Sequence, residues 1–116
     1  MTAYTPKRGD VVWLSFDPQA GHEQAGRRPA FVVSPEAYNK KTGLFIACPI
    51  TSREKGYPFE VSLPPNSTVS GVILSDQIKS LDWKARRAEF ASATDASTIG
   101  EVVDRILPLI GVEGDD

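Results

Sequence analysis

Short apolar runs separated by turn residues predict that most of the chain is a series of β-strands. The run at 11–16 is β-branched and aromatic and ends at Asp17-Pro18, which indicates a first strand. The apolar runs at 29–34 and 44–51 are short and bounded by turn residues, as buried strands are. We therefore expect the first three strands in these ranges.

The pattern weakens after position 52. Residues 59–63 alternate apolar and polar, as a half-exposed strand should, and 69–78 is expected as a fifth strand. A sixth, weaker strand is expected at 86–91. Between the second and third strands, residues 35–38 predict a brief helical turn that stops before Gly43.

The segment from Gln19 to Arg27 has no apolar period. It contains Gly21 and Gly26 among polar residues, which predicts an exposed, mobile loop. Loops held on a rigid scaffold often carry functional residues.

The last segment changes to a helical period. Thr94 or Asp95 can cap the N-terminus of this helix, Gly111 follows its end, and Pro108 should distort its last turn. Residues 113–116 are expected to be a disordered tail. The apolar positions fall at i, i+3, i+4, i+7, i+8 and i+11, which is one face of an amphipathic helix: Ile99, Val102, Val103, Ile106, Leu107 and Ile110.

These elements predict a mainly β protein with a small α content. Five or six short strands followed by one packing helix favour a small curled antiparallel sheet over alternating βαβ units. The 116 residues suit a single domain. A chain this short builds a large binding groove more easily from two copies, so dimerisation is plausible.

Composition indicates a cytoplasmic protein. Cys48 is the single cysteine, so no intramolecular disulfide is possible, and its apolar surroundings suggest a core residue rather than a nucleophile. The N-terminal residues 1–8 lack the apolar stretch of a signal peptide, and nowhere do about 18 apolar residues run together. We expect a protein of a reducing compartment that does not bind membranes.

The charges are unevenly distributed along the chain. The net charge is −2, but residues 1–88 carry 12 Lys and Arg against 8 Asp and Glu, and residues 89–116 carry one Arg against 7 acids. The basic part can line a site for an anion while the acidic part faces solvent; solvated faces without a function are the alternative. The sequence has one histidine and no HxH, CxxC or clustered carboxylate motif, so neither a metal nor another cofactor is expected.

Several motifs in fixed order resemble the MazF/PemK toxin family, and the similarity covers nearly the whole chain. Its opening is carried by 9–13, 16–18 and 21–30, and it continues through the terminal helix. The stretches that look like the MazF branch in particular are 34–43, 49–61 and 76–86.

This resemblance implies an SH3-like barrel of about five to seven strands with a C-terminal α-helix. It implies one toxin domain over 1–112, a two-fold homodimer, and sequence-selective, ribosome-independent cleavage of single-stranded RNA or mRNA that inhibits translation and growth. The implied partner is a MazE-like antitoxin whose acidic, disordered tail lies in the RNA groove.

RNA supplies its own nucleophile, the 2′-OH, so the protein need only assist proton transfer and stabilise charge on the phosphate. Metal-independent cleavage should leave a 2′,3′-cyclic phosphate and a 5′-OH. Arg28 matches the family's catalytic arginine, and its planar fork of donors suits phosphate oxygens. Thr51 matches the family's catalytic threonine, whose hydroxyl is better suited to stabilise an oxyanion than to abstract a proton.

Two loop residues are candidates for the general acid or base. Histidine is the side chain best suited to proton transfer near neutral pH, and the Kid-like branch also has histidine at the position of His22, whereas some MazF relatives have another polar residue there. Glu23 varies less than His22 within the family, although its role could be to hold the loop by pairing with a basic side chain. Asp76 matches an aspartate of the Kid-like branch, but the accompanying arginine is Leu74 here, so we prefer the pair of Arg28 and Thr51.

The remaining candidate residues are polar or basic groups for binding RNA. Each has the alternative of a solvated surface residue. Trp13 and Trp83 could stack on bases, but a core or interface role is at least as plausible. The candidate RNA-binding residues are Arg27, Gln24, Ser52, Lys55, Asp76, Gln77, Lys79, Lys84 and Arg86.

Two other functions remain alternatives. A CcdB-like toxin, which binds gyrase, shares the barrel fold without catalysis, and fold alone does not separate the two. The intact segments at 26–29 and 49–52 favour the ribonuclease, because a gyrase binder needs no RNA-cutting centre. A non-catalytic RNA-binding SH3-like module is the second alternative, and cleavage of any single-stranded RNA would exclude it.

Overall fold

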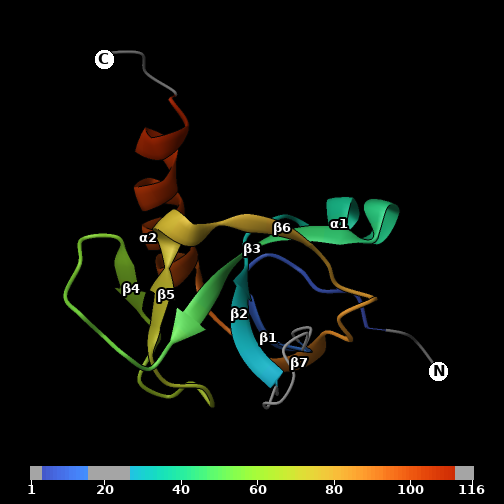
Figure 1. Cartoon of the computed structure of the whole chain (residues 1–116), viewed down its shortest axis with the longest axis horizontal. Helices are drawn as coiled ribbons and strands as arrows, with labels where there is room; N and C mark the ends of the chain where they lie inside the picture. The colour runs from blue at the N-terminus through green and yellow to red at the C-terminus, as the bar shows by residue number, and fades with distance from the viewer. Residues whose placement is uncertain (1–3, 16–26, 112–116) are drawn as a thin grey trace, which may run out of the picture.

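The computed structural model describes residues 4–15 and 27–111. Within them the chain forms a curled sheet of seven strands, all paired antiparallel (Figure 1). The expected mainly β architecture with a C-terminal helix is confirmed. The strands are β1 (Asp10–Ser15), β2 (Arg27–Val32), β3 (Leu44–Thr51), β4 (Glu60–Ser62), β5 (Val72–Leu74), β6 (Lys79–Asp82) and β7 (Glu89–Ala93).

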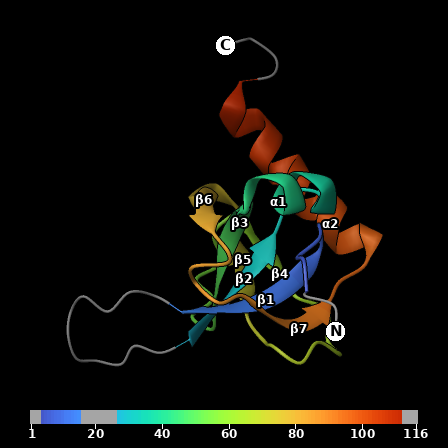
Figure 2. The ribbon, with the colours of Figure 1, turned by 90° about the vertical axis from the view of Figure 1, so that its right-hand side faces the viewer.

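Strand β3 lies at the centre of the sheet and begins and ends where the sequence predicts. One edge pairs with β2, so that Ala30 faces Pro49. The other edge is shared, because β6 pairs with the first half of β3 and β5 with its last two residues. The strands therefore curl around β3 into a barrel-like fold (Figure 2).

The central strands are buried on both faces of the sheet because successive residues along them are apolar. Val11 belongs to one core cluster and its neighbour Val12 to a second. On β3, Phe45 lies in the second cluster and Cys48 in the first. Successive side chains of a strand point to opposite faces, which explains the division. The expectation that Cys48 is a core residue is confirmed by its exposure of 0%.

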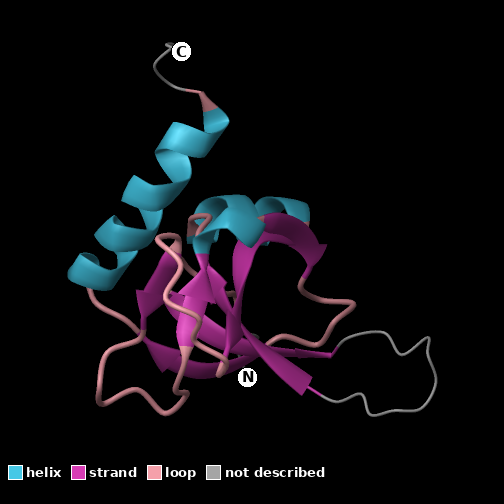
Figure 3. Cartoon of the chain, turned by 60° about the vertical axis from the view of Figure 1, so that its left-hand side comes forward, coloured by secondary structure: helices cyan, strands magenta, loops and turns pink. Residues whose placement is uncertain are grey.

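The C-terminal helix α2 (Ala96–Ile106) lies beside the sheet (Figure 3). Its residues Val102 and Ile106 belong to the first core cluster. Its cap is Asp95, whose side chain accepts a 2.9 Å hydrogen bond from the Thr98 amide. Thr94, the alternative cap, instead donates to the Gly9 carbonyl.

The predicted helix extends beyond the observed C-terminal end of α2. After Ile106 the chain tightens into the 3₁₀ helix η2 (Leu107–Ile110), which ends at Gly111 with φ of 76°. Pro108 lies in this 3₁₀ helix, so the predicted distortion of the last helical turn is confirmed. The apolar positions beyond Ile106 do not extend the buried face, because Leu107 and Ile110 are exposed.

Three further elements differ from their prediction. The short turn after Pro35 is the two-turn helix α1 (Glu36–Thr42). The single long strand at 69–78 is β5 followed by the 3₁₀ helix η1 (Ser75–Gln77). The sixth predicted strand begins three residues later, as β7.

Strand β6 has no sequence signal and was not expected. Its residues are half-buried or exposed, so no apolar alternation marks them, and the strand forms because β3 pairs with it. The predicted loop at 19–27, except Arg27, and the predicted tail lie outside the described residues. Within the described part of the chain, no helix is long and apolar enough to cross a membrane.

Candidate active site

The candidate site lies where β2 and β3 run side by side. The register that pairs Ala30 with Pro49, continued by two residues along each strand, leads to Arg28 and Thr51. Both residues line one cleft of about 770 Å³, which we call the Arg28 cleft. Its walls are formed by Trp13, Arg27, Arg28, Pro29, Ile50, Thr51, Ser52, Arg53, Thr68, Val69 and Ser70.

The hydroxyl of Thr51 is oriented by the backbone that follows it. The Arg53 amide donates a 3.1 Å hydrogen bond to Thr51 Oγ1. A hydroxyl has one proton and two acceptor lone pairs, so its proton must point away from this amide. Thr51 is half-buried and lines the cleft, which places a donor where an anion can meet it.

A second, smaller pocket of about 220 Å³ adjoins the first, and Thr51 and Arg53 line both. We call it the Tyr57 pocket. The Lys55 ammonium lies 5.9 Å from the centre of the Tyr57 ring. The Glu60 carboxylate accepts hydrogen bonds from the amides of Lys55 and Gly56, which fixes the turn carrying them. The remaining lining residues are Phe59, Glu60, Leu74, Asp76 and Gln77.

The structure thus gathers most of the described candidates into two adjoining cavities. Four of them line the Arg28 cleft and three line the Tyr57 pocket without lining the cleft. The first group is Arg27, Arg28, Thr51 and Ser52; the second is Lys55, Asp76 and Gln77.

Three predicted RNA-binding residues line neither cavity. Lys79 is exposed on β6. The Lys84 ammonium lies over the Trp83 ring at 5.5 Å, and Arg86 donates to the Ser15 carbonyl. Their RNA contacts stay predictions.

The two tryptophans differ in burial and in location. Trp83 is 7% exposed, packs in the second core cluster and donates to the Asn39 carbonyl, so it is a core residue. Trp13 is half-buried and lines the Arg28 cleft. His22, Glu23 and Gln24 lie outside the described residues.

Arg53 is a cleft residue that the sequence reasoning missed. It follows Thr51 by two positions and lines both cavities. Side chains two apart along an extended chain share a face, and this spacing was the available signal.

Two other types of catalytic site, a metal centre and a cysteine nucleophile, can be compared with the geometry. Among residues 4–15 and 27–111, no three His, Cys, Asp or Glu side chains lie close enough together to hold a metal ion. Burial raises the pKa of the Cys48 thiol to about 12, and the charge of Asp76 adds to the rise. A thiol with this pKa stays protonated near neutrality and is a poor nucleophile.

Residues 7–110 match the family model described as PemK-like, MazF-like toxin of type II toxin-antitoxin system. The chain is 44% identical over 111 residues to the endoribonuclease toxin MazF of Escherichia coli strain K12, covering 96% of this chain and 99% of that protein. It is 36% identical to the endoribonuclease PemK of Escherichia coli, over 90% of this chain and 81% of the relative.

A solved structure gives the same result for the fold. The MazE–MazF crystal structure (Form-II) from Deinococcus radiodurans superposes with a TM-score of 0.91 at 56% identity, covering 96% of this chain and 100% of that one. Sequence and fold agree over almost the full length, and the chain therefore belongs to the PemK-like, MazF-like toxins of type II toxin–antitoxin systems.

Proposed function

We propose that this toxin is an endoribonuclease that cuts single-stranded RNA at preferred sequences, with the scissile phosphate bound in the Arg28 cleft. One observation carries the proposal: Arg28 and Thr51, from neighbouring strands, line the same cleft. A fixed guanidinium and a hydroxyl donor at one place suit a phosphate that gains negative charge as it reacts. The relatives from Escherichia coli are named endoribonucleases, which supports the assignment.

The reaction uses the substrate's own nucleophile. The 2′-oxygen attacks the adjacent phosphorus, the bond to the leaving 5′-oxygen breaks, and the products carry a 2′,3′-cyclic phosphate and a 5′-OH. The 2′-OH loses its proton to a base and the leaving oxygen gains one. Arg28 and Thr51 stabilise the oxyanion, and His22 or Glu23 carries the protons. No metal-activated water is needed for this route.

The Tyr57 pocket is suited to hold a base next to the bound phosphate. Single-stranded RNA is recognised by stacking unpaired bases on aromatic rings and by hydrogen bonds to their edges. Tyr57 offers a ring that is 59% exposed, and Asp76 and Gln77 offer hydrogen-bonding groups in the same pocket. Selectivity for a short sequence then arises partly here.

The test is cleavage of a synthetic RNA in EDTA. The cut site is mapped first, and the RNA is then made with one 2′-deoxy nucleotide immediately 5′ of the cut phosphate. This substrate should bind normally and resist cutting, because only the nucleophile is missing. An RNA with the 2′-deoxy nucleotide one position farther downstream should still be cut. Efficient cutting of the first substrate, or strict dependence on added divalent metal, would overturn the mechanism.

The proposed partner is an acidic antitoxin segment that competes with RNA for the same cleft. Three arginines line the Arg28 cleft, and carboxylates as well as phosphates pair with guanidinium groups. The MazE–MazF complexes from Deinococcus radiodurans support a partner of this type. An acidic antitoxin peptide titrated onto the complex with labelled RNA should displace the RNA, and displacement should weaken with salt. Unchanged RNA affinity would indicate separate sites.

The proposed working form is a cytoplasmic homodimer. Leu107, Leu109 and Ile110 of η2 are exposed, and apolar side chains gathered on a surface are typical of an interface. Sedimentation at micromolar protein should give the mass of two chains. A monomer with full activity would remove the dimer from the proposal.

A further inference from the structure

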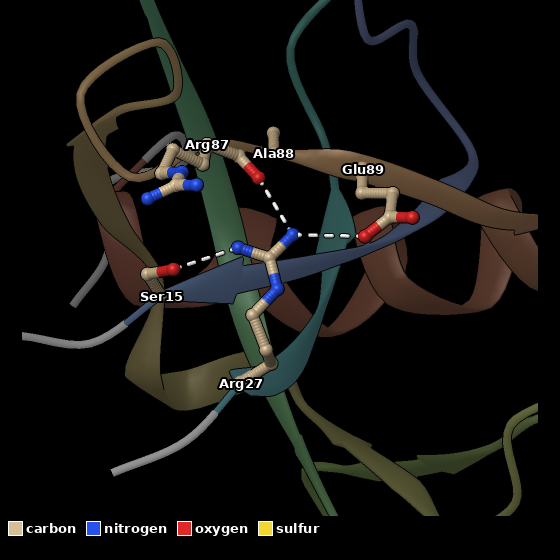
Figure 4. A pocket seen from close by; sticks show the side chains of 5 residues that line it. All are labelled: Ser15, Arg27, Arg87, Ala88 and Glu89. Carbon is tan, nitrogen blue, oxygen red and sulfur yellow. Dashed lines mark hydrogen bonds and ion pairs between the residues drawn. The ribbon is translucent and has the colours of Figure 1, made fainter.

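Arg27 lines the Arg28 cleft, and its guanidinium is held by protein atoms. Its Nη1 donates a 2.7 Å hydrogen bond to Ser15 Oγ, and its Nη2 donates to the Arg87 carbonyl at 2.7 Å and to the Glu89 carboxylate at 3.1 Å (Figure 4). Two longer contacts reach the carbonyls of Trp13 and Arg86, at 3.4 and 3.5 Å. One guanidinium therefore joins β1, the turn before β7, and β7 itself.

The turn that Arg27 holds has an unusual backbone. Arg87 has φ of 57°, and it is the sole non-glycine residue of the described chain with positive φ. An L-residue in this region costs about 1–2 kcal/mol and needs support from its surroundings. The Arg87 carbonyl accepts the charge-assisted bond from Arg27, and the Arg86 carbonyl accepts from the Ser15 amide at 2.9 Å. The turn and the first residue of β2 thus stabilise each other.

This anchor lies next to the proposed catalytic arginine. In the β1–β2 register Arg27 faces Ser15 and Arg28 faces Leu14, which is fully buried. Neighbouring side chains on a strand point to opposite faces. Holding Arg27 against β7 therefore restricts the rotation of the strand that carries Arg28 into the cleft it shares with Thr51.

We propose that Arg27 is a positioning residue for Arg28 rather than a contact for RNA. The inference rests on the proposed function, because it gives Arg28 a task that depends on its orientation. Lysine cannot replace it, because an ammonium lacks the planar fork that reaches three elements at once. Displacing a catalytic group by about 1 Å can cost a factor of about 100 in rate.

Arg105 provides a matched control. Its side chain is 35% exposed against 33% for Arg27. It donates to the Pro58 carbonyl outside α2 and contacts Glu101 within its own helix. Arg105→Met therefore measures the cost of removing a partly exposed arginine anchor that does not border the cleft. We expect it to cut RNA at the wild-type rate.

The experiment compares Arg27→Met, Arg27→Lys and Arg105→Met by steady-state and single-turnover cleavage of one RNA, with Tm measured for each. Both Arg27 variants should lower kcat by about 10- to 100-fold with KM changed less than about threefold. Their Tm should remain close to that of Arg105→Met. A raised KM with normal kcat, restored by lysine, would make Arg27 a phosphate contact and overturn the proposal. Unchanged kinetics in both Arg27 variants would also overturn the proposal.

A double variant tests whether Arg27 acts through Arg28. In the Arg28→Ala background, Arg27→Met should lower the residual single-turnover rate less than about twofold, because there is no guanidinium left to orient. Full additivity would contradict positioning. Failure of the proposed function is recognised separately, because Arg28→Ala would then cut normally whatever Arg27 does.

Discussion

Gly71 lies directly against the backbone of Thr51. It has φ of 128°, and a Cβ built on it would overlap the Thr51 carbonyl oxygen. The Gly71 carbonyl also accepts a hydrogen bond from the Leu63 amide at 3.2 Å. The loop before β5 can therefore approach β3 at Thr51 only because position 71 has no side chain.

Gly71→Ala should destabilise the protein and slow cleavage. The conformation alone costs about 1–3 kcal/mol for a residue with a Cβ, and the overlap pushes Thr51 out of place. Gly100→Ala is the control, because nothing lies within 4 Å of its added Cβ in α2. That variant should be about 0.5–1 kcal/mol more stable. Urea denaturation and kcat measure both effects, and a Gly71→Ala protein of normal stability and rate would contradict the packing argument.

Thr51→Val should lower kcat by about 100-fold while RNA binding changes little. The substitution keeps the shape of the side chain and removes the donor proposed for the oxyanion. Thr51→Ser keeps that donor and should retain activity to within about tenfold of wild type. Equal rates for the two variants would reduce Thr51 to a residue of the scaffold.

Arg53→Gln should weaken RNA binding without a comparable change in kcat. Arg53 lines both cavities, so its charge lies where an RNA backbone would cross from one to the other. Losing one phosphate contact should reduce the slope of log Kd against log salt concentration by about 1. Lys40→Gln on α1 is the control and should leave that slope unchanged. An unchanged slope for Arg53→Gln would place its side chain off the RNA path.

The cap of α2 should make stability depend on pH in acid. Hydrogen bonds from the amide and hydroxyl of Thr98 lower the pKa of Asp95 below its ordinary value of about 3.9. A lowered folded pKa stabilises the folded state above the unfolded pKa, and this gain is lost as pH falls through the folded pKa. Asp95→Asn keeps a cap that does not titrate. The Tm advantage of wild type over this variant should shrink from pH 6 to pH 3; a constant difference would contradict the assignment.

The sequence predicts elements well where burial repeats regularly. Strand β3 packs against neighbouring strands along its length, so the bounds of its apolar run in the sequence are the bounds of the observed strand. Strand β6 is exposed or half-buried and exists because β3 offers it a free edge, which no local pattern records. The end of α2 shows the opposite error, because apolar residues continue past the buried face.

The site is only partly readable from residue types. Arg28 and Thr51 are 23 positions apart in the chain. Their placement in one cleft depends on the β2–β3 register, so the resemblance and not the local chemistry selected them as candidates. Arg27 shows the limit of reasoning from charge. An arginine beside the proposed catalytic arginine suggests another phosphate contact, and only the structure shows that its donors also reach carbonyls contributed by distant segments.

The most direct test of the account is the single-turnover rate of Arg28→Ala at saturating RNA, with Kd, Tm and sedimentation measured on the same preparation. The rate should fall by at least about 1,000-fold, because a charge-stabilising donor is removed from the transition state. Tm and the dimer should be unchanged, since Arg28 is exposed and outside both core clusters. A fall of only two- or threefold would mean that RNA is not cut in this cleft by Arg28.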